Sequence, residues 1–91
     1  MSAKIKGTVS DSGNNPIQYA KVAIYSLPDS VLVTETTTDE RGEFTFTNLN
    51  SVNKMMKVSF NGYKETAFRA LPEQHVKLRG DAKKSEELAV K

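Results

Sequence analysis

The chain has 91 residues, with 13 Lys and Arg against 11 Asp and Glu, and it contains neither cysteine nor tryptophan. This length supports one domain with one small core, and the missing thiol excludes disulfides and cysteine chemistry. A net charge of +2 gives no strong field for nucleic acid or an anionic membrane, and no apolar run is long enough to span a bilayer. The N-terminal residues do not resemble a signal peptide, so we expect either a cytosolic protein or a mature domain from a longer precursor.

Short runs of alternating apolar and polar residues predict seven β-strands, taken here in chain order. The first is residues 5–10, in which Ile5 and Val9 share a face, and the second is residues 20–25. The third, residues 31–37, is rich in Thr and Glu. That composition is typical of an exposed or edge strand.

The segment from Thr38 to Phe46 carries the clearest turn signal in the chain. Asp39 and Gly42 stand at the first and fourth positions of a type I turn, and glycine adopts a positive φ most easily. We expect this turn to join the third strand to the fourth, residues 43–49, as a hairpin with one buried face.

Three more strands are predicted at residues 55–60, 63–70 and 73–78. The Asn61-Gly62 pair is typical of a two-residue type I′ turn and predicts a tight hairpin. Turns every eight to twelve residues favour a β-sandwich over residues 1–81, followed by a charged tail or linker, residues 82–91. The inward strand positions predict a core of Ile5, Val9, Val22, Ile24, Phe44, Phe46, Met56, Val58, Phe60, Val76 and Leu78.

Few residues offer chemistry. His75 is the single histidine and has no Cys or second His with which to share a metal, so we interpret it as a surface residue. Asp11, Asn14 and Asn15 are close in sequence, but a calcium loop needs more carboxylates at alternate positions, so a turn is the better interpretation. We therefore predict no metal site.

Three acidic residues, Asp39, Glu40 and Glu43, lie in or beside the predicted turn, so we interpret them as turn residues and not as a paired catalytic acid and base. The absence of Trp also weakens a sugar-stacking site. Single-strand binding would interleave cations with exposed aromatics, but the aromatics here fall mostly at inward positions. The cations of the C-terminal half are thus interpreted as a solvated face: Lys54, Lys57, Lys64, Arg69, Lys77 and Arg79.

One stretch of the third strand suggests a route to a protein partner. Thr34, Thr36, Thr37 and Thr38 form a β-favouring run that we expect to be exposed. If that strand is a sheet edge, its backbone can pair with another strand.

The chain resembles the carboxypeptidase regulatory-like domain, a family with a transthyretin-like (prealbumin-like), seven-stranded antiparallel β-sandwich fold. The resemblance covers about residues 4–79. It rests on five segments: Ile5 to Asp11, Pro16-Ile17, Ala20 to Val22, Thr38 to Phe44, and Val58 to Lys64.

Within that family the chain is most similar to the copies at the N-terminus of TonB-dependent receptors and other outer-membrane β-barrel proteins. Those copies sit in the periplasm ahead of the plug and barrel. The segment from Glu87 to Val90 is similar to their lead-in to the plug, whereas Asn61 departs from their usual aliphatic residue. The resemblance implies no catalytic, cofactor-binding or metal-binding residues.

We therefore expect a non-enzymatic, periplasmic accessory or interaction domain of such a transporter or barrel protein. Its partners are expected to be proteins or the parent barrel, with no nucleic acid and no membrane insertion of the domain itself. Two alternatives stay open. One is an appended sandwich of a secreted peptidase or glycan-active enzyme, and the other is a small carbohydrate- or cell-surface-binding module. Oligomeric state is not fixed by the sequence.

Overall fold

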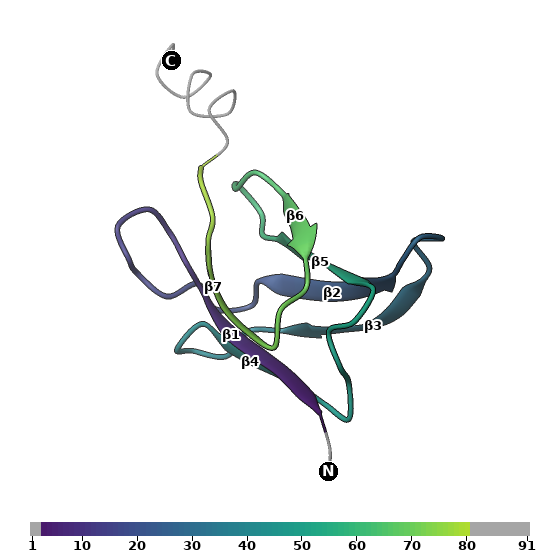
Figure 1. Cartoon of the computed structure of the whole chain (residues 1–91). Coiled ribbons are helices and arrows are strands. Elements are labelled where there is room, and N and C mark those ends of the chain that lie inside the picture. The colour runs from purple at the N-terminus through teal and green to yellow at the C-terminus, as the bar shows by residue number, and fades with distance from the viewer. Residues whose placement is uncertain (1–2, 81–91) are drawn as a thin grey trace.

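A computed structural model describes residues 3–80, which form seven β-strands and no helix within that range (Figure 1). The strands follow the alternating runs of the sequence to within a few residues. Their bounds are β1 (Lys4–Ser10), β2 (Lys21–Ser26), β3 (Leu32–Thr37), β4 (Glu43–Thr47), β5 (Lys54–Ser59), β6 (Thr66–Arg69) and β7 (Glu73–Lys77).

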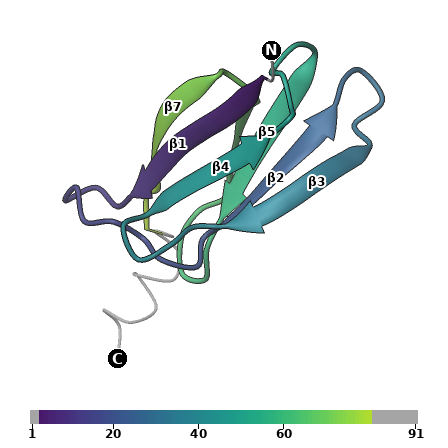
Figure 2. The same ribbon diagram turned by 90° about the horizontal axis from the view of Figure 1, so that it is seen from below.

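The strands build two sheets that pack face to face, as seen from below in Figure 2. One sheet has three strands in the order β4-β1-β7, and the other has four in the order β3-β2-β5-β6. The predicted all-β, seven-stranded sandwich is confirmed, and the predicted exposed or edge position of the third strand is confirmed as well. Residues 81–91, which include the predicted tail, lie outside the described residues.

One strand pair departs from the predicted antiparallel arrangement. β1 and β7 pair in parallel, with Val9 opposite Val76, whereas the other ladders are antiparallel. The physical reason is that β7 enters its sheet from β6, a strand of the opposite sheet, so it starts at the same end of the sandwich as β1. Gly7 lies in this pairing, and a Cβ there would come 2.1 Å from the Gln74 carbonyl oxygen and 2.8 Å from Phe44. Only glycine permits that close approach.

The core lies between the two sheets. Ten of the eleven predicted core residues are buried; the exception is Phe60, which is only partly buried and packs against the core from a loop. Four further buried apolar residues were not predicted: Ile17, Ala20, Ala23 and Ala70.

The Asp39 turn has the predicted local form. Gly42 has φ of +72°, and the Asp39 carboxylate Oδ1 accepts the backbone N–H of Arg41 and of Glu43, both at 2.9 Å. The predicted hairpin is wrong, because β3 and β4 belong to different sheets. The turn is instead a crossover between sheets. The buried Thr38 precedes it, donating its backbone N–H to the Ala20 carbonyl and its hydroxyl to the Ile17 carbonyl.

The predicted type I′ turn at Asn61-Gly62 is also wrong. Gly62 has φ of +88°, but Asn61 does not have the positive φ that this turn requires. β5 ends at Ser59 and β6 begins at Thr66, so the connection is longer. The rings of Phe60 and Tyr63 lie 5.9 Å apart and pack against the core, which accounts for the wider loop.

Candidate functional site

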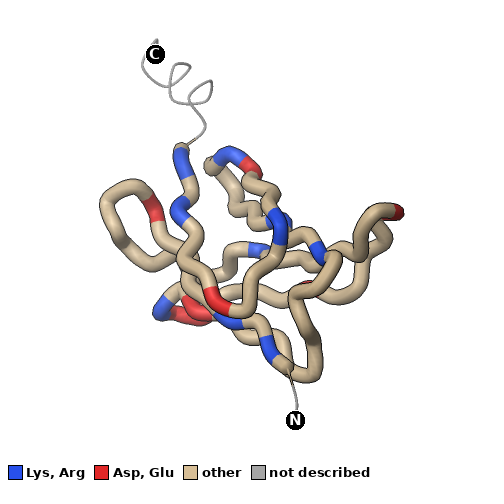
Figure 3. Tube along the Cα trace, in the orientation of Figure 1, with Lys and Arg blue, Asp and Glu red and all other residues tan. Residues whose placement is uncertain are grey.

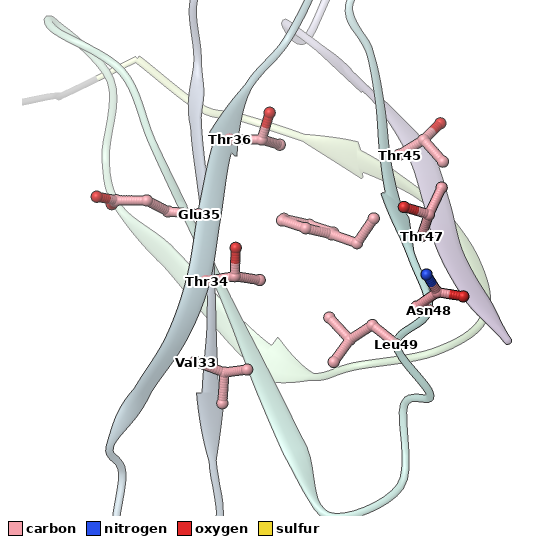
Figure 4. Close-up of a pocket in the computed structure, with 9 residues that line it drawn as sticks. Val33, Thr34, Glu35, Thr36, Thr45, Thr47, Asn48 and Leu49 are labelled. Carbon is pink, nitrogen blue, oxygen red and sulfur yellow. The ribbon is translucent and has the colours of Figure 1, made fainter.

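A groove of about 430 Å³ opens between β3 and β4 (Figure 4). These strands are the outer strands of the two sheets, so each has one edge that is not paired within the sandwich. The crossover at Asp39 brings the two edges to the same side of the molecule. The groove is lined by Val33, Thr34, Glu35, Thr36, Thr45, Phe46, Thr47, Asn48 and Leu49.

The floor of the groove is apolar and its walls carry hydroxyl groups. Phe46 is only 6% exposed and belongs to the core, while Leu49 packs against that core from the end of β4. Thr34 and Thr36 are half-buried on the inward face of β3. The groove therefore offers a small apolar contact flanked by backbone edges and threonines.

Charge in this groove is confined to one side chain. Glu35 is the single ionisable residue in its lining, and its carboxylate lies 3.1 Å from the Lys21 ammonium. Both side chains are about half exposed, so the pair contributes at most about 1 kcal/mol. The groove interior is otherwise uncharged.

The Asp11 segment forms a turn. The Asp11 carboxylate Oδ1 accepts the backbone N–H of Gly13 and of Asn15, both at 2.9 Å. The hydrogen bond from the Asn15 N–H is the main cause that holds the pKa of Asp11 below its ordinary value. An oxygen that already accepts these donors is poorly placed to bind a cation. Within residues 3–80 no three His, Cys, Asp or Glu side chains gather in a way that could hold a metal ion.

His75 lies exposed on the outer face of the three-stranded sheet. Its Nδ1 is 2.8 Å from the Thr8 hydroxyl, on the neighbouring strand β1. This pairing holds the imidazole beside a hydroxyl, but the structure gives no carboxylate hydrogen bond that would orient the ring as in a nucleophilic triad. Asp39 is likewise occupied, because its carboxylate holds the turn that contains Arg41.

Lys and Arg residues do not gather into one stripe on the described trace (Figure 3). They occur on both sheets and are interspersed with acidic residues. Among residues 3–80 one cation meets an aromatic ring, since the Lys57 ammonium lies 5.1 Å from the centroid of Tyr25. A single such pair falls short of the interleaved cations and aromatics that bind single-stranded nucleic acid.

The sequence predicted the β3 side of the groove but not the β4 side. The threonines of β3 were identified as an edge, although Thr38 was expected to be exposed and is buried. The contribution of Phe46 and Leu49 was missed, because a hairpin between the third and fourth strands would have closed this space. The sequence held one indication of this groove, the aliphatic run Val31 to Val33, which is unusual for a strand expected to face water.

The described residues thus form a small all-β sandwich domain with open outer edges. The carboxypeptidase regulatory-like domain family matches residues 4–87, which is nearly the whole sequence. The chain therefore belongs to the carboxypeptidase regulatory-like domain family.

Solved structures share the fold at low sequence identity. The Bacillus anthracis TIE protein matches with a TM-score of 0.67 and 22% identity over 88% of this chain and 17% of its own length. A 3-chlorocatechol 1,2-dioxygenase from Rhodococcus opacus 1CP matches with a TM-score of 0.66 and 12% identity over 89% of this chain and 60% of its own. A streptococcal ancillary pilin matches with a TM-score of 0.62 and 17% identity over 88% of this chain and 33% of its own.

These three likenesses show the fold alone, and the chain spans less than two thirds of each of those proteins. The family match indicates a regulatory-like module. No curated protein sequence matches the chain significantly. No helix suited to crossing a membrane occurs among residues 3–80.

Proposed function

We propose that this domain is a periplasmic accessory domain of a TonB-dependent transporter or another outer-membrane barrel protein. Its role is to help the parent protein assemble or couple to periplasmic protein partners, without contributing to ligand chemistry. The observation that carries this proposal is the match of the family across nearly the whole chain. The similarity of Glu87 to Val90 to the lead-in of a plug supports the transporter context.

The chemistry of the described surface supports a role by contact. The carboxylates of Asp11 and Asp39 are held by backbone N–H groups in turns, and His75 is hydrogen-bonded to Thr8 on an exposed face. His75 and Thr8 form a base–hydroxyl pair, but no hydrogen bond within residues 3–80 joins that imidazole to a carboxylate that would orient it. The groove between β3 and β4 is the site at which a partner would bind.

The position of the described chain ends also supports a tethered domain. Gly80 forms a bridge with Tyr63 at one end of the sandwich, whereas the start of β1 lies at the other end (Figure 1). A parent protein joined after Gly80 would hold the domain by one end. The loops at the opposite end and the groove along β3 would then stay accessible to a partner.

The test is an in-frame deletion of this domain from its parent protein. Substrate uptake, the abundance of the folded barrel and the ligand affinity of the purified barrel are measured together. We expect uptake or barrel abundance to fall while ligand affinity stays unchanged. Loss of ligand affinity in a correctly folded barrel would contradict the proposal and favour a carbohydrate- or ligand-binding module. Unchanged uptake, abundance and affinity would also contradict it.

A further inference from the structure

The free edge of β3 presents unpaired backbone groups at known positions. Thr38 donates its N–H to the Ala20 carbonyl at 3.0 Å, and this pair has the same register as the ladder between β2 and β3. Hydrogen-bonded pairs alternate along an antiparallel ladder, so the backbones of Thr34 and Thr36 face β2. The N–H and C=O groups of Glu35 and Thr37 therefore point away from β2, toward the open edge.

The same edge carries exposed aliphatic side chains. Val31, Leu32 and Val33 are 55%, 48% and 43% exposed at the start of β3. Proteins normally protect such an edge with prolines, inward charges or a covering segment. β3 contains no proline, and Glu35 is its only charged residue. Its ladder with β2 shifts register once, between Ile24 and Tyr25 of β2. The edge is thus suited to pairing.

We propose that β3 accepts an extended segment of a protein partner as an added strand, which lies over the groove toward β4. This inference rests on the proposed function and names the way in which the partner binds. Each residue of the added strand that faces Glu35 or Thr37 would exchange backbone hydrogen bonds with the free edge. Alternate side chains of that strand would enter the groove beside Thr34 and Thr36, above Phe46 and Leu49.

The groove also defines the chemistry of the partner segment. Because its interior holds no counter-charge, the side chains that enter it are uncharged and small or β-branched. On the outer face, a basic residue fits opposite Glu35, and an acidic one would meet a like charge directly opposite it. The same rule disfavours two copies of this chain pairing in the register centred on Glu35. The predicted ligand is therefore an otherwise uncharged β-strand with one Lys or Arg on its outer face.

The probe is a labelled synthetic heptapeptide with valine at every odd position, threonine at the second and sixth, and lysine at the fourth. Binding to the 91-residue chain is measured by fluorescence anisotropy. Amide hydrogen exchange is followed by NMR in the same samples. We expect the Glu35 and Thr37 amides to exchange rapidly in the free chain and to slow when the peptide binds. The Thr34 and Thr36 amides should be protected in both states.

Three variants separate this mode from the alternatives. Glu35→Pro removes one outward N–H and should weaken peptide binding by about tenfold, which corresponds to about 1.4 kcal/mol. Ala67→Pro is the matched control, because Ala70 N–H bonds to the Lys54 carbonyl and the alternation from that pair turns the Ala67 N–H toward the free edge of β6, which does not line the groove. This control should bind normally. Circular dichroism checks that both variants fold.

Glu35→Arg keeps the backbone N–H and supplies an independent test by charge. It should weaken binding of the lysine peptide and strengthen binding of the same peptide with glutamate at its fourth position. Absence of binding, binding lost in Ala67→Pro but kept in Glu35→Pro, or a dimer in sedimentation whose β3 amides are already protected would each overturn the inference. A deletion phenotype alongside any of these results would leave the proposed function intact and move the contact elsewhere.

Discussion

Gly42 should be the least replaceable residue of the crossover between the two sheets. It has φ of +72°, and a Cβ built on it would lie 2.4 Å from the Val9 carbonyl oxygen. That carbonyl accepts the Ile17 N–H at 3.0 Å, and the Gly42 carbonyl accepts the Val9 N–H at 2.7 Å. A side chain at Gly42 would therefore disturb the backbone hydrogen bonds that join the turn to β1.

The cost of Gly42→Val follows from these contacts. A β-branched residue at positive φ costs about 1–3 kcal/mol. Displacing the Val9 carbonyl weakens one or two hydrogen bonds, each contributing about 0.5–1.5 kcal/mol. We expect a total of about 1.5–6 kcal/mol, against roughly 5–15 kcal/mol for a whole domain.

The assay is urea unfolding followed by circular dichroism, with Gly80→Val as the matched control. A Cβ at Gly80 meets nothing within 4 Å, and Gly80 does not have a positive φ. The control should change the midpoint by little. Equal midpoints for the two variants would refute the reasoning, because they would show that neither the positive φ nor the contact with Val9 constrains this turn.

Three further predictions follow from the core and from the turns. Phe46→Ala should destabilise the chain by about 3–5 kcal/mol, since Phe46 is 6% exposed, and a barely shifted denaturant midpoint would remove it from the core. Calorimetric titration with zinc or calcium should reveal no site tighter than about micromolar, and a stoichiometric tighter site would contradict the turn assignments of Asp11 and Asp39. The pKa of Asp11 is lowered from 3.8 on folding, so its contribution to stability is present above pH 3.8 and is lost as pH falls through the folded pKa. Asp11→Asn should flatten the stability profile below pH 3.8, and an unchanged slope there would contradict this assignment.

Strand positions and most of the core could be predicted because both depend on a local pattern. Alternation at period two placed Ile5, Val9 and Val22 inward, and each is fully buried. Strand bounds shifted by a residue or more, as at β5, which begins at Lys54. The burial of Ile17 could not be predicted, because this residue lies outside the alternating runs and is covered only when the loop before β2 folds against the sandwich.

Sheet assignment depends on contacts that the local pattern does not contain. The Asp39 turn has the same hydrogen bonds whether it joins paired strands or carries the chain to another sheet. Here the Thr38 N–H fixes the end of β3 to the Ala20 carbonyl at the start of β2, and the Gly42 carbonyl fixes the start of β4 to the Val9 N–H of β1. Each anchor belongs to a different sheet, so the turn becomes a crossover.

That crossover also explains why a groove exists in this protein. In a hairpin, β3 and β4 would satisfy each other's backbone groups and bury Phe46 beneath a continuous sheet. As the outer strands of opposite sheets, they instead leave two free edges facing one opening, with Phe46 and Leu49 between them. The stability cost expected at Gly42 and the free edge of β3 thus both follow from the crossover. Gly42 variants that still fold should lose protection at β4 amides first, because the anchor to Val9 is lost while β3 keeps its ladder with β2. Loss of amide protection in β3 before β4 would contradict this account of the groove.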